Sequence, residues 1–303
     1  MASVYTHQSS NVFKTYILMG LFLAVTVGLG YLASLYYSSP VIVYIAIVFS
    51  VLMNITSFWW SDKIVLKLSN ARPANRKDFF DLYTVTENLS IVAGLPMPKL
   101  FVIDDPAPNA FATGRNKEHA VVAVTTGLLN KLDKSELEGV IAHELSHIGN
   151  RDILLMSAVV VLVGFISIIS DIFLREMMFD GNRDNNKGGG AFAIVGVILI
   201  ILSPIIATLI KLAISRRREF LADASGVLLT RYPEGLASAL EKISSYNMPM
   251  KKTSTATAHL FISNPFSKLQ SGQEKNPKAS FVNLFQTHPP INERINILRK
   301  MIN

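Results

Sequence analysis

Residues 139–152 of the chain read GVIAHELSHIGNRD. Within this stretch His143, Glu144 and His147 form an HExxH pattern, and on a helix two positions four residues apart share one face. Both imidazoles can therefore bind one zinc ion, while Glu144 can reach an attacking water. The alternative is a pair of surface histidines on an ordinary helix, and the helical context of the motif counts against it.

A third metal ligand has to come from elsewhere in the chain, because a catalytic zinc ion normally takes three protein ligands. The chain has no cysteine, so any transition metal must be held by histidine and carboxylate. The best candidate is Glu219 in REFLAD, residues 218–223. Asp223, one helical turn beyond, can accept the second ring N–H of a ligating histidine. The alternative for both acids is a solvated helix face, which three preceding arginines make credible.

The composition is that of a membrane protein. Half of the residues are hydrophobic, 17% are charged and the mean hydropathy is +0.35. The alternative is that the apolar stretches are core helices of a soluble protein, but core helices rarely stay apolar on every face for about 20 residues. Four apolar stretches each hold about 20 residues, enough to cross the roughly 30 Å hydrocarbon core as a helix; they are 16–37, 41–60, 153–174 and 191–214.

Basic residues predict the orientation of these stretches. Five Lys or Arg residues lie between 63 and 77, after the second stretch, and three arginines at 216–218 follow the fourth. The positive-inside rule then places both termini and the candidate site in the cytoplasm. We interpret the first stretch as a retained anchor, because its apolar core is too long for a signal peptide. The net charge of +7 fits anionic lipid better than nucleic acid, because the basic residues adjoin apolar runs.

Two apolar stretches separate the HExxH pattern from Glu219, so the chain returns to the side it left and the ligands can meet. Whether these two stretches cross fully or form a re-entrant hairpin stays open. We expect a mainly α membrane protein with four transmembrane helices and a cytoplasmic α+β catalytic domain. Its parts are two transmembrane helices in 1–60, the first catalytic part in 61–152, two further transmembrane helices in 153–214 and the second catalytic part in 215–303.

Local patterns predict the elements of the soluble parts. Ser135 with Glu138 fits a capping box that opens the HExxH helix. The polar segment 248–280 is predicted to be a long loop, and we consider it a candidate lid over the site. The other predicted elements are a helix over 76–93 ending at Gly94, strands at 100–103 and 120–125, a helical stretch from 214 to about Tyr246, and a helix over 290–302.

These residues predict metal-assisted hydrolysis, in which Glu144 accepts a proton from water and later delivers it to the leaving amine. The tetrahedral oxyanion needs a second electrophile besides the metal. His288 and Arg294 are the candidates. The alternative for His288 is a residue that merely precedes a helix beginning at Pro289 and Pro290.

Taken together, these motifs resemble the HtpX heat-shock membrane proteases, which are gluzincin metallopeptidases related to the CAAX prenyl protease type I. The resemblance covers nearly the whole chain. It rests on the paired N-terminal apolar stretches, PNAFATG at 108–114, HELSH followed by GNRD at 149–152, the two further apolar stretches, REFLADASG from 218, and THPP at 287–290 with Arg294.

The resemblance implies a zincin-like catalytic domain with one zinc ion per chain at His143, His147 and Glu219. Glu144 would be catalytic and Asp223 supportive, while His288 and Arg294 would face the oxyanion or the substrate. An edge strand would pair with an extended substrate peptide; its residues are Asn109, Ala110, Phe111 and Ala112, for which an ordinary turn is the alternative.

The resemblance further implies a stress-response role in membrane-protein quality control. The enzyme would lie in the bacterial inner membrane, cleave misfolded or damaged membrane proteins and unfolded polypeptides on the cytoplasmic side, and overlap in function with other quality-control proteases. Prenyl-protein processing is the second enzymatic interpretation, although four spans are few for an enclosed lipid chamber. A metal-binding scaffold or transporter should carry ionisable residues within its spans, and these spans are almost bare of them.

Overall fold

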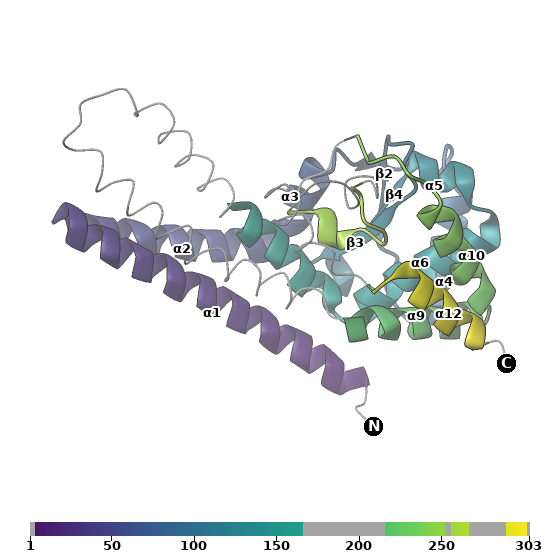
Figure 1. The fold of residues 1–303 in the computed structure, drawn as a ribbon, viewed down its shortest axis with the longest axis horizontal. Coiled ribbons are helices and arrows are strands. Elements are labelled where there is room, and N and C mark those ends of the chain that lie inside the picture. The colour runs from purple at the N-terminus through teal and green to yellow at the C-terminus, as the bar shows by residue number, and fades with distance from the viewer. Residues whose placement is uncertain (1–3, 166–215, 252–255, 267–288, 302–303) are drawn as a thin grey trace, which may run out of the picture.

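The computed structural model describes residues 4–165, 216–251, 256–266 and 289–301. Figure 1 shows two parts, a pair of long helices and a compact body of helices around one sheet. The fourth predicted apolar stretch, the part of the third stretch beyond Phe165, and His288 lie outside the described residues.

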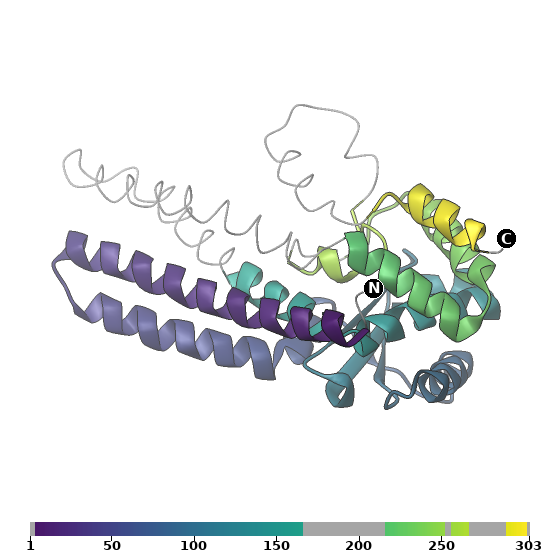
Figure 2. The same cartoon turned by 90° about the horizontal axis from the view of Figure 1, so that it is seen from below.

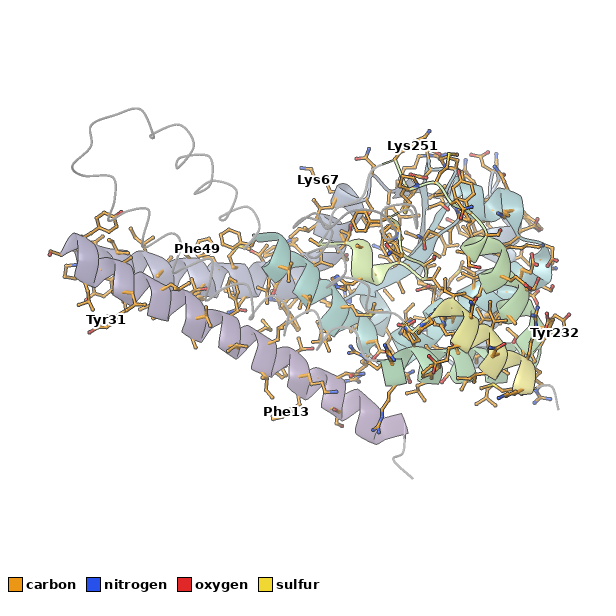
Figure 3. All side chains as sticks on the ribbon, in the orientation of Figure 1. Phe13, Tyr31, Phe49, Lys67, Tyr232 and Lys251 are labelled. Carbon is orange, nitrogen blue, oxygen red and sulfur yellow. The ribbon has the colours of Figure 1, made fainter. Side chains whose placement is uncertain are left out.

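The helical pair consists of α1 (Val4–Tyr37) and α2 (Val41–Trp59), which run side by side in both views (Figures 1 and 2). Both contain segments long and apolar enough to cross a membrane, Ser9–Leu35 in α1 and Val41–Trp59 in α2. Side chains such as those labelled Phe13 and Tyr31 project outward from α1 (Figure 3). The chain therefore carries two candidate spans within the described residues, and the predicted count of four is not reached there.

A third apolar helix, Asp152–Phe165, follows α6 (Lys134–Gly149) after a bend of 84°. Arg151 adopts a left-handed backbone conformation at this bend, with φ of 58°. The first turns of the helix are buried against α1, where Leu155, Val159 and Leu162 meet Leu18. The bend lets the chain pass from the motif helix to the apolar helix Asp152–Phe165 within two residues.

One four-stranded sheet lies beside α6, in the order β1-β2-β4-β3. The strands β2 (Lys99–Ile103) and β4 (Ala120–Thr125) are parallel and match the two predicted strands. The strand β3 (Ala110–Gly114) pairs antiparallel with β4 and forms one edge of the sheet. The short β1 (Arg72–Pro73) forms the other edge.

The helix predicted over 76–93 begins later, at Phe80, and α4 (Phe80–Ala93) ends at Gly94 as expected. Gly94 has a φ of 63°, a left-handed conformation that favours glycine at the end of a helix. The side that α4 turns inward carries Leu82, Val85 and Leu89, whereas Phe80 is exposed. Hydrophobic residues occur on two sides of this helix, and only its packing against α6 decides which of them are covered.

The capping box of α6 is formed by Asp133 and Glu136, two residues earlier than predicted. The Asp133 carboxylate accepts the Glu136 amide at 2.9 Å, and the Glu136 carboxylate accepts the Asp133 amide at 2.9 Å. Ser135 lies inside the first turn and donates to Asp133 at 2.8 Å. Both pairs satisfy the spacing of the motif, but only Asp133 lies at the boundary where the amides lack helical partners.

The second half of the body is made of α9 (Arg216–Thr230), α10 (Pro233–Ser244) and α12 (Ile291–Lys300). The stretch predicted to be helical to Tyr246 is thus two helices, separated where Arg231 has a φ of 53° and Pro233 begins α10. The remaining elements are α3 (Ser61–Leu68), α5 (Thr126–Lys131) and the short 3-10 turns Lys117–His119 and Ala258–Leu260. The helix α6 packs against α4, α9, α10 and β3, so the motif helix lies at the centre of the body.

The packing of α6 on α10 depends on a glycine. A Cβ atom at Gly139 would lie 2.6 Å from the backbone nitrogen of Leu236, so Gly139→Ala must push the two helices apart. We expect this variant to lose about 1–3 kcal/mol of unfolding free energy. The matched control is Gly149→Ala in the same helix, where the nearest atom is 3.8 Å away and the change should stay within about 0.5 kcal/mol. Thermal unfolding of both purified variants measures the difference, and equal melting temperatures would contradict the close contact.

Candidate metal centre

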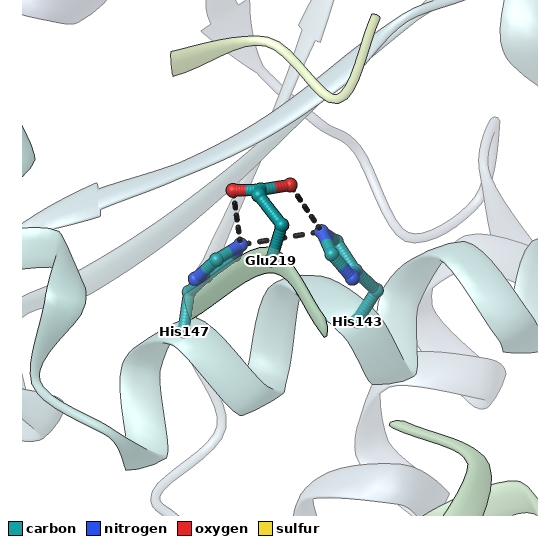
Figure 4. A group of neighbouring side chains, drawn as sticks. All are labelled: His143, His147 and Glu219. Carbon is teal, nitrogen blue, oxygen red and sulfur yellow. Dashed lines mark hydrogen bonds and ion pairs between the residues drawn. The ribbon is translucent and has the colours of Figure 1, made fainter. Parts of the chain in front are cut away.

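The helices α6 and α9 bring His143, His147 and Glu219 together (Figure 4). One ligand atom from each side chain lies within 4.8 Å of the others, and all three side chains are buried. The two Nε2 atoms are 3.2 Å apart. The Glu219 oxygens lie 3.8 Å from His143 Nε2 and 3.7 Å from His147 Nε2. Residues that are 76 positions apart in the sequence therefore form one compact set of donors.

Gly226 allows α9 to approach α6 this closely. A Cβ atom at Gly226 would lie 3.1 Å from the backbone nitrogen of His143. Because the helices meet with so little between them, Glu219, two turns earlier on α9, reaches over to the imidazoles. Small residues at a helix crossing are an uninformative signal in sequence, so this contact could not be recognised before the fold was known.

A carboxylate contacts the Nδ1 atom of each imidazole. Asp223 Oδ1 lies 2.9 Å from Nδ1 of His143, and Asp152 Oδ2 lies 2.9 Å from Nδ1 of His147. A carboxylate at Nδ1 accepts the ring N–H and leaves the Nε2 lone pair directed at the centre of the group. Asp223 occupies the place expected for it. Asp152 was given no role in the sequence analysis, because its reach to His147 depends on the bend after α6.

Arg294 lies in the same cluster and is fully buried. Its Nε and Nη2 atoms donate to the two oxygens of Asp223 at 2.8 and 2.6 Å, a bidentate pair, and its Nη1 lies 3.5 Å from Glu219 Oε2. Burial lowers the pKa of Arg294, but Asp223 outweighs that effect and raises it above its usual value. Arg294 therefore stays charged and holds two acids of the cluster.

Burial and neighbouring charges shift the pKa values of the acids in opposite directions. Burial raises the pKa of Glu144 to about 7, although the neighbouring His147 opposes this. Burial would raise the pKa of Asp223 as well, but Arg294 and the His143 hydrogen bond outweigh it and hold the value at about 2. Glu144 is thus close to balance between its two protonation states at neutral pH, whereas Asp223 is a permanent anion.

The two histidines differ in the same way. Burial lowers the pKa of His143 below its usual value, and the nearby Arg294 contributes to this. Burial also lowers the pKa of His147, but the Asp152 hydrogen bond and the Glu219 charge outweigh it and raise the pKa to about 9. Without a metal ion, His147 therefore carries a proton at neutral pH, which any metal ion must displace.

The edge strand β3 runs beside the cluster, and part of its outer side is covered by residues 261–263. Ile262 donates its amide to the Ala110 carbonyl at 3.0 Å. The Asn109 side chain exchanges two hydrogen bonds with the backbone of Ser263, at 2.9 and 3.2 Å. Phe261 packs edge-on against Phe111. The Asn109 side chain, expected to contact a substrate, is thus engaged by the chain itself.

The donor set fits zinc. Two imidazole nitrogens and one carboxylate are the ligands of a common class of catalytic zinc sites, and both imidazoles here have the carboxylate partners that orient such ligands. The structure brings His143, His147 and Glu219 together in one cluster, with Arg294 beside them. His288 lies outside the described residues, so its expected place near the oxyanion has no structural counterpart here.

Comparisons with known proteins agree with this geometry. Residues 76–302 match the model of peptidase family M48. A protease HtpX homolog of Caldanaerobacter subterraneus subsp. tengcongensis is 45% identical over 306 residues, covering 99% of this chain and 98% of the relative. A protease HtpX homolog of Tropheryma whipplei, strain TW08/27, is 42% identical over 300 residues, covering 99% of both chains.

Among solved structures, the crystal structure of S. mikatae Ste24p aligns with a TM-score of 0.49 and 20% identity, over 93% of this chain and 62% of that one. The family assignment rests on the sequence matches, which extend over nearly the full length of both chains. The buried His-His-Glu cluster and the apolar helices fit the same conclusion. The chain belongs to peptidase family M48 and is a metalloprotease of the HtpX type.

Proposed function

We propose that this metalloprotease is a zinc endopeptidase that cleaves misfolded or damaged membrane proteins on the cytoplasmic side of the bacterial inner membrane. The observation that carries the proposal is the buried cluster of His143, His147 and Glu219, with Glu144 next to the first ligand on α6. These three side chains would hold one zinc ion per chain. The catalytic unit would be built from 61–152 and 215–303.

A zinc ion held by His143, His147 and Glu219 would supply Lewis acidity toward the scissile carbonyl and the attacking water. The task of Glu144 is to take the proton from that water and to pass it on to the leaving amine. A base that must both accept and donate works best when its pKa is near the ambient pH. In the metal-free cluster burial raises the pKa of Glu144 to about 7, and this effect of burial favours protonation of Glu144 after it has taken the proton. Its buried position also keeps other proton donors away.

Arg294 would act mainly by holding the ligands in place. Its guanidinium binds Asp223 in bidentate fashion, and Asp223 in turn orients His143. The same guanidinium approaches Glu219, so one side chain steadies two of the three ligands. Its role toward the oxyanion, and that of His288, remain proposals that rest on the family resemblance.

The edge strand β3 would bind the substrate by adding it as a further strand. The carbonyl of Ala110 points away from β4 to Ile262, and the amide of Gly114 points away from β4 to Ser157. Because the backbone groups of a strand alternate between its two sides, those of Ala112 face the same outer side. The Ala112 amide lies close enough to the Glu144 carboxylate to lower its pKa slightly. A peptide that took the place of residues 261–263 along this edge would therefore pass Glu144 and the zinc ligands in an extended conformation.

A membrane-protein substrate fits the position of this strand. Thr113 lies 2.7 Å from Ser157, hydroxyl to hydroxyl, and the Gly114 amide donates to Ser157 at 3.3 Å. Ser157 belongs to the apolar helix Asp152–Phe165, so the far end of β3 adjoins the membrane-directed part of the protein. An unfolded segment leaving the bilayer would meet β3 first at this end. The basic residues after α2 support a cytoplasmic site.

The assigned roles predict two different phenotypes. Glu144→Gln should keep about one zinc ion per chain but lower cleavage of an unfolded membrane protein by at least about 100-fold, because it removes the base. Glu219→Ala should lose both zinc and cleavage. Glu138→Gln, in the same helix but outside the cluster, is the control and should retain both. Metal analysis and a gel-based cleavage assay in detergent measure these outcomes. If Glu144→Gln cleaves the substrate as fast as the wild type does, Glu144 is not the base. If the wild-type protein binds no zinc, the proposed metal site is wrong.

Binding by strand addition predicts an alternating pattern along the substrate. A methyl group on a peptide amide that faces β3 removes one hydrogen bond and adds bulk, so cleavage should fall by roughly 10-fold. Methylation of the next amide, which points away from β3, should have little effect. A series of singly N-methylated peptides, assayed for kcat/KM, reveals the alternation. A uniform loss at every position would exclude this mode of binding.

The raised pKa of His147 predicts that zinc binding depends on pH. Below about pH 9 the imidazole of the zinc-free protein carries a proton, so zinc binding should release it and tighten by up to tenfold for each pH unit between 7 and 8.5. Titration calorimetry in buffers of different ionisation enthalpy counts the protons. The measurement uses the Glu144→Gln background, which removes the titration of Glu144.

Asp152→Asn is the matched variant for this measurement. It removes the negative charge that raises the pKa of His147, so it should release fewer protons on binding zinc than its parent. A zinc affinity that does not change between pH 7 and 8.5 in the parent protein would contradict the raised pKa.

A further inference from the structure

The zinc ligand His147 is connected to the first helix of the chain through two buried hydrogen bonds. Asp152 Oδ2 accepts from His147 Nδ1 at 2.9 Å, and Asp152 Oδ1 accepts from the Asn11 amide group at 2.6 Å. The same Asn11 nitrogen donates to the Asn150 carbonyl at 3.1 Å. Asn11 is buried, although 139 positions separate it from Asn150. A residue of α1 thus binds both ends of the turn that leads from α6 to the apolar helix.

Asn11 lies beyond the part of α1 that is paired with α2. The side chain of Asn54 in α2 donates to the Met19 carbonyl of α1, and Trp59 at the end of α2 lines the same shallow groove as Tyr16. Because Trp59 is the last residue of α2, the turns of α1 that precede Tyr16 extend past the end of its partner. These turns pass beside the catalytic body instead (Figure 2).

One stripe of α1 faces the body and the helix Asp152–Phe165. Its members are spaced three or four residues apart and are all buried; they are Asn11, Thr15, Leu18 and Phe22. The apolar pair, Leu18 and Phe22, packs against Leu155, Val159 and Leu162. Phe13, by contrast, points away from the body (Figure 3). The apolar contacts determine the position of α1. Asn11, at the end of the same stripe, then contacts Asp152.

We propose that Asn11 is a positioning residue for the metal site, through which the seating of the first membrane helix controls the orientation of His147. A carboxylate that must accept the His147 ring N–H with one oxygen is fixed only if its other oxygen is also bound. Asn11 supplies that bond. Arg218 Nε, at 4.0 Å from Asp152 Oδ1, is the charged group that would draw the carboxylate toward itself if Asn11 were missing.

The hydrogen bond between Asn11 and Asp152 matters for the metal site because both residues are buried. Asp152 is 1% exposed and Asn11 is 4% exposed, so water cannot easily take the place of the lost amide. Loss of the direct partner of a ligating histidine weakens metal binding by roughly 10- to 100-fold. Asn11 contacts Asp152 and not the ligand His147 itself. We therefore expect Asn11→Ala to weaken zinc binding by roughly 3- to 10-fold, less than Asp152→Asn does.

A purely structural role for Asn11, in which it only joins α1 to the body, predicts a different order of variants. Aspartate has the shape of asparagine, so a packing role would be served better by Asn11→Asp than by Asn11→Ala. If the amide is needed as a donor to Asp152, the aspartate places two carboxylates in contact and is the more harmful change. The order of the two variants in zinc affinity therefore separates the two roles.

The experiment measures the zinc dissociation constant of the full chain in detergent micelles, by competition with a chelator, after removal of bound metal. This inference rests on the proposed zinc site, so wild-type protein is titrated first. The variants are Asn11→Ala, Asn11→Asp, Asp152→Asn and the double variant Asn11→Ala with Asp152→Asn. The control is Thr15→Val, one turn along the same buried stripe, whose hydroxyl donates to the Asn11 carbonyl of its own helix. Thermal unfolding of the zinc-free forms reports stability separately.

The expected result is weaker zinc binding in the order wild type, Asn11→Ala, Asn11→Asp, with Thr15→Val equal to wild type. In the Asp152→Asn background, Asn11→Ala should cause no further loss of zinc affinity, because the path through Asp152 is already broken. If Asn11→Ala proves too unstable to purify, the Co²⁺ absorption spectrum of Asn11→Asp, which keeps the shape of the side chain, tests the geometry of the site.

Four results would overturn the inference. A larger loss of zinc affinity in Asn11→Ala than in Asn11→Asp would show that Asn11 only joins α1 to the body. Zinc affinity within twofold of wild type in both Asn11 variants would show that the contact does not reach the metal. An equal loss from Asn11→Ala with and without Asp152→Asn would show that it acts by another path. A wild-type protein that binds no zinc would overturn the proposed metal site together with this inference, whereas normal wild-type binding with unaffected variants would overturn the inference alone.

Discussion

The packing of α6 against α9 depends on the balance between the buried acidic and basic side chains where the two helices meet. Four buried carboxylates surround the two histidines, namely Glu144, Asp152, Glu219 and Asp223, and two buried guanidinium groups, Arg218 and Arg294, accompany them. With neutral imidazoles this leaves a formal excess of two negative charges, which one divalent cation balances. Isolated buried charge is too costly to persist unpaired. The raised pKa of His147 reflects the same excess, because Asp152, Glu219 and Glu144 favour its protonated form, whereas the pKa of Glu144 is raised mainly by burial and in smaller part by Glu219.

The junction also ties the catalytic body to the helices that are candidates for crossing the membrane. The helix α6 carries both histidines, ends at Gly149, and continues after an 84° bend as the apolar helix Asp152–Phe165. Asp152, the first residue of that helix, is at once its start and the partner of His147. The edge strand β3 reaches the same helix through Ser157. The candidate metal site, the edge strand β3 and the apolar helix therefore share one short segment of chain, so a displacement of one should shift the others.

The local elements follow from the sequence to different extents. The strands at 100–103 and 120–125 and the end of α4 at Gly94 were predictable, because β-branched runs and a left-handed glycine are local features. The capping box was placed at Ser135 and is at Asp133, since the two candidates differ only in where the helix begins. The inward side of α4 and the break between α9 and α10 depend on neighbours distant in sequence, which no local pattern contains.

The sequence by itself determined the chemistry of the site. The spacing of His143 and His147 requires one helical face, the absence of cysteine requires nitrogen and oxygen ligands, and Glu219 with Asp223 was the best remaining pair of acids. Only the tertiary structure decided how these groups are held. Gly226 lets the two helices touch, Arg294 is drawn into the cluster, and Asn11 and Asp152 meet His147 because two helices pack and a third bends. Ligand identity is a property of residue type and spacing, whereas ligand orientation depends on contacts between segments that the sequence keeps far apart.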